Sequence, residues 1–175
     1  MTSTRDNLGD VMVVGGGISG IQAALDLAGS GFRVYLVERD PTIGGKMAQI
    51  DKTFPTNDCS MCIESPKFIE CDRHPNIEIL TYTEVDNVEG EAGDFKVTLK
   101  KKARAVDPQR CVACNLCAEK CPQKVPDPFN LNLNQRKAIY IPYPQVVPLV
   151  YTIDKEHCTY FIKGKCRICE KVCKN

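Results

Sequence analysis

The stretch that decides the fold is VMVVGGGISGIQAALDLAGSGFRVYLVE, residues 11–38. It begins with an apolar run that ends at a glycine, which is typical of a buried strand. After a glycine-rich turn, apolar residues recur at helical spacing and predict a helix over residues 21–30, which a following glycine ends. A second apolar run, residues 34–37, predicts another buried strand that ends at Glu38. Strand, helix and strand in this order form a βαβ unit, whose crossover makes the two strands parallel.

The glycines of this stretch match a dinucleotide-binding fingerprint. Gly15 allows a tight turn, Gly17 lets the backbone approach a pyrophosphate, and Gly20 permits close packing of the helix against the strand. The N-terminus of the helix then offers free N–H groups and a partial positive charge to the phosphates. Glu38 can accept hydrogen bonds from the hydroxyls of an adenosine ribose, and its charge would repel a 2′-phosphate, which argues against NADP.

FAD is favoured over NAD because a second glycine turn, Gly44-Gly45, follows the βαβ unit closely. Such a turn suits a flavoprotein, in which backbone lies near the ribityl chain. We therefore expect the ADP half of FAD to bind here, and the alternative is a glycine-rich turn without a ligand. The residues expected to bind the cofactor are Gly15, Gly17, Ile18, Ser19, Gly20, Glu38, Arg39, Gly45 and Lys46.

The chain after the βαβ unit is less regular at first. Residues 39–71 are punctuated by proline and glycine and indicate irregular backbone. A short strand is predicted at residues 76–80. Residues 81–89 and 95–101 flank a turn-forming segment and predict a β-hairpin.

The composition changes near Asp107 and Pro108, where cysteine and proline become dense. We place a domain boundary there. Residues 1–108 are expected to form the dinucleotide-binding portion, and residues 109–175 a small cluster-binding module. Within that module a short helix is expected around residues 131–138.

Eleven of the 175 residues are cysteine, and the polar first residues give no sign of a secretion signal. The count is odd, and most of the cysteines are spaced like metal or cluster ligands rather than like a disulfide framework. We therefore expect a reducing compartment and a cytoplasmic location. The formal net charge of +1 gives no electrostatic case for nucleic acid or for an anionic membrane surface, and no apolar run is long enough to insert into a membrane.

The strongest motif is Cys111-x2-Cys114-x2-Cys117-x3-Cys121-Pro122, the run typical of bacterial ferredoxins. Three thiolates at this close spacing can wrap around one corner of a [4Fe–4S] cluster, while the fourth serves the other cluster of a two-cluster module. Zinc sites commonly use separate CxxC pairs, so zinc is the weaker alternative.

A second run, Cys158-x7-Cys166-x2-Cys169-x3-Cys173, keeps the same rhythm after a longer first spacing. The ferredoxin rule, in which the last cysteine of a run serves the other cluster, predicts two crossed clusters. Because the crossing pins both runs together, ligation should contribute folding free energy, and we expect the module to be unfolded without its clusters. Cluster one is expected to take Cys111, Cys114, Cys117 and Cys173, and cluster two Cys158, Cys166, Cys169 and Cys121.

Three further cysteines, Cys59, Cys62 and Cys71, allow more than one interpretation. Cys59 and Cys62 could ligate a third cluster, with Cys71 and a fourth ligand from outside the chain. They could also form a redox dithiol, whose reactivity would depend on a lowered thiol pKa. Buried and inert thiols are the remaining alternative.

Seven segments of the chain occur in the order seen in a known family: GGGISG, VERDPTIGG, KTFPTNDCSMC, RHPNIEIL, the CxxCxxCxxxCP run, RKAIYIPYPQVVP and CTYFIKGKCRICEKVC. In these segments the chain resembles the A subunit of heterodisulfide reductase. It is similar as well to relatives of that protein in sulfate-reducing organisms, including the A subunit of the quinone-interacting membrane-bound oxidoreductase complex. The resemblance spans nearly the whole chain.

The resemblance implies an FAD and [4Fe–4S] flavoprotein of a thioredoxin-reductase-like fold with an inserted ferredoxin module. It also implies flavin-based electron bifurcation within a multi-subunit complex, in which a homodimer is one conceivable assembly. Family members are much longer than this chain. We therefore expect an N-terminal portion, a truncated product or one part of a split protein, with most of the isoalloxazine surroundings lying elsewhere.

Three functions are weighed on these grounds. The first is one component of a flavin-dependent oxidoreductase complex that passes electrons between FAD and the clusters, which carry the chemistry themselves. The second is a pure electron carrier whose glycine-rich turn is empty. The third is an inactive truncated fragment or a scaffold whose cysteines hold zinc. Bound flavin separates the first from the second, and the brown absorbance of iron–sulfur clusters separates both from the third.

Overall fold

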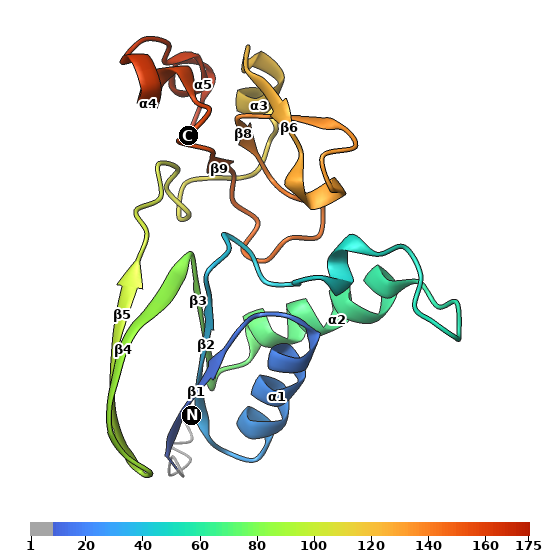
Figure 1. Ribbon diagram of the computed structural model, residues 1–175, viewed down its shortest axis with the longest axis vertical. Helices are drawn as coiled ribbons and strands as arrows, with labels where there is room; N and C mark the ends of the chain where they lie inside the picture. The colour runs from blue at the N-terminus through green and yellow to red at the C-terminus, as the bar shows by residue number, and fades with distance from the viewer. Residues whose placement is uncertain (1–8) are drawn as a thin grey trace. The chain divides into compact units, whose positions relative to one another are not determined.

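A parallel sheet forms the centre of the first part of the chain in the computed structural model, which describes residues 9–175 (Figure 1). Its strands are β1 (Asp10–Val14), β2 (Arg33–Glu38) and β3 (Ile77–Thr81), with β2 in the middle. Both pairs, β1 with β2 and β2 with β3, are parallel. The predicted βαβ unit is therefore confirmed, and so is the α/β fold class.

The chain divides into two compact units between Ala103 and Arg104. The composition had indicated a boundary slightly later, near Asp107 and Pro108. The polar start of the chain, from which the absence of a secretion signal was expected, falls mainly on residues 1–8 and lies outside the described residues. Each unit has its own secondary structure and its own buried residues.

α1 (Ile18–Gly29) connects β1 to β2 and buries one stripe of its surface. The helix begins three residues earlier than the hydrophobic pattern predicted, because extended backbone at Gly17 already serves as its N-cap. Burying an isoleucine such as Ile21, which is 0% exposed, contributes roughly 1.5–3 kcal/mol of stability. The buried stripe consists of Ile21, Ala24, Leu25 and Ala28.

α2 (Ser60–Arg73) was missed, because residues 39–71 indicated irregular backbone. Its buried face consists of Ser60, Glu64, Phe68 and Cys71. Pro66 lies inside the helix, where it lacks the N–H of a helical hydrogen bond. A partly polar buried face and an internal proline hide the helical period from the sequence. α2 packs beside α1 and against the short 3-10 helix η1 (Met47–Gln49).

A β-hairpin completes the first unit, as predicted. Its strands β4 (Thr83–Glu91) and β5 (Asp94–Lys101) are antiparallel, and Glu91 lies opposite Asp94. The two residues between them form the turn, in which Gly93 has a φ of +98°. A left-handed backbone at this place favours glycine, which explains why the glycine-rich segment ends the first strand.

The second unit consists of short elements joined by long irregular segments. Its two small sheets are the antiparallel pairs β6–β7 and β8–β9. No helix among residues 9–175 has the length and apolar character that a membrane span needs. In chain order the elements are α3 (Leu116–Lys120), β6 (Lys124–Pro126), η2 (Pro128–Asn130), β7 (Gln135–Lys137), β8 (Ile139–Tyr140), β9 (Thr152–Ile153), α4 (Thr159–Lys163) and α5 (Ile168–Val172).

The helix expected around residues 131–138 is wrong. Leu131 and Asn132 have left-handed backbone, with φ of +51° and +63°, which a right-handed helix cannot accommodate. The following residues form β7 instead, which pairs with β6 across the turn. The segment between the two cysteine runs is therefore a small hairpin.

Candidate functional site

The first glycine turn leaves the C-terminal end of β1 and opens α1. Gly15 has a φ of +104°, and its N–H donates to the carbonyl of Val37 on the neighbouring strand at 2.8 Å. A Cβ atom at Gly20 would lie 1.9 Å from the carbonyl oxygen of Gly15. Position 20 therefore has to be glycine if the helix is to start so close to the strand.

The second glycine turn lies directly against the first. The N–H of Gly44 donates to the carbonyl of Gly16 at 2.7 Å, and a Cβ atom at Gly45 would come within 2.9 Å of the Cα of Gly17. A Cβ atom at Gly17 itself would meet nothing closer than Gly45 Cα at 4.0 Å. The two turns thus form one backbone surface that has no side chains, which is the surface a pyrophosphate and its flanking chain require.

Glu38 supports this surface in a way that the sequence did not indicate. The side chain is only 8% exposed. Its Oε2 accepts a hydrogen bond from the N–H of Gly16 at 2.6 Å, and its Oε1 accepts one from the N–H of Asp40 at 2.8 Å. Each oxygen keeps a further lone pair, so the carboxylate can brace the turn and still accept from a ribose hydroxyl.

The remaining expected FAD ligands surround the turns. Ile18 and Ser19 are the first residues of α1, and the N–H groups of a first helical turn have no partner within the helix. Lys46 caps η1, and its Nζ donates to Gln49 Oε1 at 3.2 Å. Arg39 is exposed immediately after β2. The structure thus gathers both glycine turns, Glu38 and the helix start, while Arg39 and Lys46 lie at the margin. These groups fit a dinucleotide.

All eight cysteines of the two ferredoxin-like runs line one cavity of about 510 Å³ in the second unit. The other walls are largely apolar and include Ile139, Tyr151 and Phe161. Donors of one chemical type, collected from two runs into one apolar cavity, fit iron–sulfur clusters. The eight residues are Cys111, Cys114, Cys117, Cys121, Cys158, Cys166, Cys169 and Cys173.

The thiols sort into two neighbourhoods. Burial raises the pKa of Cys117 to about 11, and the nearby Cys111 and Cys114 raise it further. Burial also raises the pKa of Cys169, with contributions from Cys158 and Cys121. Because thiols act on each other in this way only at short range, Cys121 of the first run lies near thiols of the second run. Iron would reverse the effect of burial, since a coordinated thiol is deprotonated.

Left-handed backbone turns the closely spaced thiols toward the cavity. Ala113 and Asn115, which flank Cys114, have φ of +52° and +68°. Asn115 is fixed by Tyr151, whose hydroxyl donates to Asn115 Oδ1 at 2.6 Å. Cys166 has a φ of +80°, which is uncommon for a residue other than glycine and costs free energy. Tyr151 is thus a supporting residue that the sequence suggested only weakly.

The third group of cysteines is not a single site. Cys59 is the N-cap of α2, and Cys59 and Cys62 form a disulfide. Cys71 lies twelve residues further along the same helix, roughly 18 Å from Cys59 at 1.5 Å per residue. Its side chain is fully buried, and its thiol donates to the carbonyl of Ile21 at 3.8 Å. The expectation that Cys71 joins the other two on a third cluster is therefore wrong.

Comparison with known families agrees with both halves of this description. Residues 10–58 match a family model described as FAD dependent oxidoreductase, and residues 104–127 match one described as 4Fe-4S binding domain. FAD and [4Fe–4S] clusters, the predicted cofactors, are the groups that these two models name.

Among solved structures, similar chains include L-proline dehydrogenase from P. horikoshii and thioredoxin reductase from T. acidophilum. The first is 26% identical, with a TM-score of 0.45, and the match covers 53% of this chain and 20% of the other. The second is 22% identical, with a TM-score of 0.44, and the match covers 51% of this chain and 31% of the other.

Curated relatives are much more similar in sequence. The iron-sulfur A subunit of the CoB–CoM heterodisulfide reductase from Methanocaldococcus jannaschii is 55% identical over 93% of this chain and 24% of its own length. A protein of Archaeoglobus profundus that is named as similar to the heterodisulfide reductase A subunit is 57% identical over 85% of this chain and 21% of its own length. The chain thus spans about a quarter of the length of the curated relatives it matches, and over most of its residues it is a homologue of part of the A subunit of heterodisulfide reductase.

Proposed function

We propose that this chain is an electron-transfer part of an FAD- and iron–sulfur-dependent oxidoreductase of the heterodisulfide reductase type. The observation that carries the proposal is the cavity lined by all eight cysteines in ferredoxin order, in the same chain as a backbone surface shaped for a dinucleotide. A pure electron carrier would have no need of that surface. A zinc scaffold would have no need of eight thiols around one cavity.

The residues of the first unit would bind and orient the cofactor. The free N–H groups at the start of α1 favour the negative charge of a pyrophosphate, and the paired glycine turns let it approach the backbone. Glu38 would accept from the ribose while its other lone pairs hold the N–H groups of Gly16 and Asp40. Gly45 and Lys46 would lie beside the chain that leads to the flavin ring.

The residues of the second unit would hold two [4Fe–4S] clusters in the crossed arrangement. The proximity of Cys121 to Cys158 and Cys169 supports its assignment to cluster two. The apolar walls would exclude water, which together with hydrogen bonds to the sulfurs adjusts the reduction potential. When bound, FAD and the clusters accept and release electrons, and the protein contributes their positions and surroundings.

The partners and the substrate extend this proposal to the larger assembly. The relatives are named as subunits of heterodisulfide reductases, and one from Methanothermobacter marburgensis is named as part of an H(2):CoB-CoM heterodisulfide,ferredoxin reductase. We infer that this chain works with other subunits, in a cytoplasm reducing enough to keep the cluster thiols reduced. Two copies pairing as a homodimer is compatible with the same role.

Cys59 and Cys62 have a second role within the proposal. Their disulfide at the N-terminus of α2 favours a redox dithiol, since a helix N-terminus stabilises a thiolate. Ligation of a third cluster would require both thiols in the reduced form and further ligands from outside the pair. The iron count described next separates these two roles.

The test is anaerobic purification or cluster reconstitution of the full chain, followed by counts of iron, sulfide and flavin. About eight irons with bound flavin per chain support two clusters and a usable dinucleotide site, and about twelve add a third cluster. Eight irons without flavin favour the electron carrier. Zinc without sulfide overturns the electron-transfer role.

A further inference from the structure

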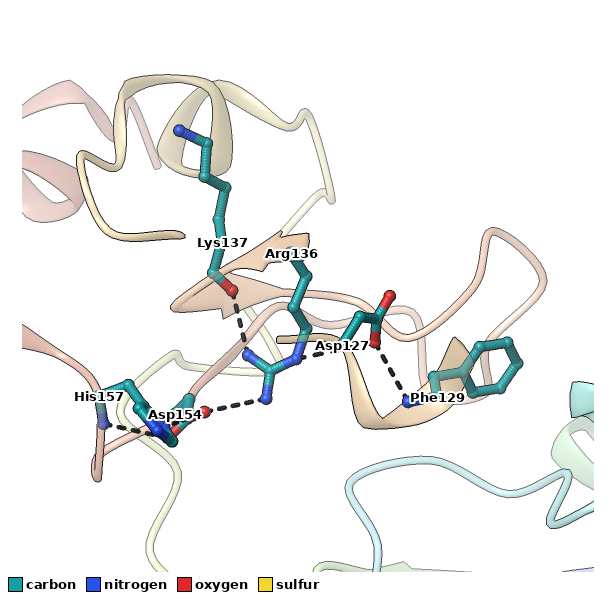
Figure 2. A network of polar contacts seen from close by, with 6 residues as sticks. All are labelled: Asp127, Phe129, Arg136, Lys137, Asp154 and His157. Atoms are coloured by element: carbon teal, nitrogen blue, oxygen red, sulfur yellow. Dashed lines mark hydrogen bonds and ion pairs between the residues drawn. The ribbon is translucent and has the colours of Figure 1, made fainter. Parts of the chain in front are cut away.

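A buried ionic network lies in the hairpin between the two cysteine runs (Figure 2). Arg136 on β7 is its centre, with a side chain only 12% exposed. Its Nη2 donates to Asp154 Oδ2 at 2.9 Å, and its Nε lies 3.9 Å from Asp127 Oδ1. The guanidinium also stacks on Tyr140, 3.6 Å from the ring centroid. Such a desolvated and stacked guanidinium holds its partners in one geometry.

Asp154 begins the turn that presents Cys158. The backbone carbonyl of Asp154 accepts from the N–H of Cys158 at 2.9 Å. Its carboxylate accepts from the backbone N–H of His157 at 3.2 Å and lies 2.9 Å from His157 Nδ1 (Figure 2). Arg136 therefore holds the residue on which the approach to Cys158 depends.

The next residue of β7 reaches the other run. Lys137 Nζ donates to the backbone carbonyl of Cys121 at 2.6 Å. Neighbouring residues of a strand point to opposite faces, so Arg136 and Lys137 can hold two different loops at once. The residues just after these loops are also joined, because Gln123 Nε2 donates to Thr159 Oγ1 at 2.6 Å.

We propose that Arg136 and Lys137 are positioning residues, which set the separation between Cys121 and Cys158. The inference rests on the proposed function, in which these two cysteines come from different runs and ligate the same cluster. Cys173, the crossed ligand of cluster one, is exposed near the end of the chain, and its thiol donates to the carbonyl of Asn175. The clamp formed by Arg136 and Lys137 therefore acts on cluster two.

The test uses the full chain with reconstituted clusters and compares Arg136→Met and Lys137→Met with wild type. The measurements are the EPR spectrum of the reduced protein and the rate of iron release to a chelator. Cys114→Ala and Cys169→Ala serve as references that assign the signals to cluster one and cluster two. Loss of an outer partner of a metal ligand typically weakens metal binding roughly 10- to 100-fold. We expect iron release from cluster two to accelerate roughly 10-fold in both variants, with cluster one unchanged.

Arg167→Met is the matched control. Arg167 adjoins Cys166 and pairs with Glu170 at 2.5 Å, but both side chains are more than half exposed. Its loss removes a positive charge beside a ligand without removing the clamp, so release should stay at the wild-type rate. Arg136→Lys keeps a donor and a charge, and should restore part of the slower release.

The double variant Arg136→Met with Asp154→Asn covers the case in which the single variant loses both clusters through a lone buried charge. Removing both charges relieves that cost, while the link to the Cys158 turn is still broken, so selective loss of cluster two is again expected. Equal loss of both clusters in the double variant would overturn the inference, as would unchanged release in Arg136→Met and Lys137→Met or an equal effect of Arg167→Met. Failure of the proposed function shows separately, as wild-type protein without iron and sulfide.

Discussion

The two units build their sites from different parts of the polypeptide. In the first unit the site is backbone, where two glycine turns and the start of α1 offer N–H groups and close approach. In the second unit the site is side chain, where eight thiols from two runs line an apolar cavity. A backbone site is already stabilised by the fold around it, whereas a thiol site needs its cluster to hold the ligands together. The first unit should therefore tolerate the loss of its ligand, and the second should not.

The largest expected effect is on cluster ligation. Cys114→Ala should remove cluster one and unfold much of residues 109–175, because the crossed clusters tie the two runs together. Iron content and hydrogen exchange, read peptide by peptide, would measure both effects. Exchange in α1 and β2 should stay as in wild type. Full iron content in Cys114→Ala would contradict the ligand assignment.

A backbone collision should produce the next largest effect. Gly20→Ala would place a Cβ atom 1.9 Å from Gly15 O, and should cost about 3 kcal/mol or more. Gly29→Ala on the same helix is the matched control, since its Cβ atom would meet nothing within 4 Å. That variant should be neutral or stabilised by roughly 0.5–1 kcal/mol. Urea unfolding of the first unit distinguishes them, and similar midpoints for the two variants would refute the close-packing role of Gly20.

The first unit also contains a buried acid that predicts a pH dependence. Glu64 on α2 is 0% exposed, and neither carboxylate oxygen has a hydrogen-bond partner among the described residues. Burial raises the pKa of Glu64 from 4.5 to about 7. Between these values the folded chain binds a proton that the unfolded chain has released, so stability falls as the pH rises through this range. The loss should be on the order of 3 kcal/mol and complete above pH 7.

Glu64→Gln tests this directly. The variant cannot ionise, so its urea midpoint should change less between pH 5 and pH 8 than that of wild type. An identical pH dependence in the two proteins would show that the carboxylate is solvated or paired in solution.

A smaller effect is expected at the adenosine end of the site. Glu38→Gln keeps one acceptor but turns an amide toward a backbone N–H that the carboxylate now satisfies, which should cost about 1–2 kcal/mol. FAD affinity should fall roughly 10-fold by the same argument. The control is Glu78→Gln on β3, whose ion pair with Arg33 is about half exposed and should matter little. Equal FAD affinity in wild type and Glu38→Gln would exclude the ribose role.

The sequence predicted the parts of the molecule whose cause is local. The apolar runs and glycine spacing around Gly15 and Gly20 indicated the βαβ unit, and the cysteine spacing indicated the thiols that line the cavity. α2 escaped because its buried face includes Ser60 and Glu64, so burial no longer follows hydrophobicity. In each of these cases one segment of chain carried the signal or concealed it.

Contacts between distant segments were out of reach. Nothing near Arg136 in the sequence indicates that it pairs with Asp154, eighteen residues later, or that Glu38 braces Gly16, twenty-two residues earlier. The strand at β7 replaced the expected helix because left-handed backbone at Leu131 and Asn132 returns the chain to β6. Pairing across a turn decides such short segments more strongly than their own propensity.

A reductive titration of the reconstituted chain with FAD tests the central claim most directly, because it counts the electrons that one chain accepts. Under anaerobic conditions, visible absorbance follows flavin bleaching and EPR follows the reduced clusters. The account predicts uptake of about four electrons per chain, two by the flavin and one by each of two clusters. Uptake of two electrons or fewer, with no EPR signal from a reduced cluster, would contradict it.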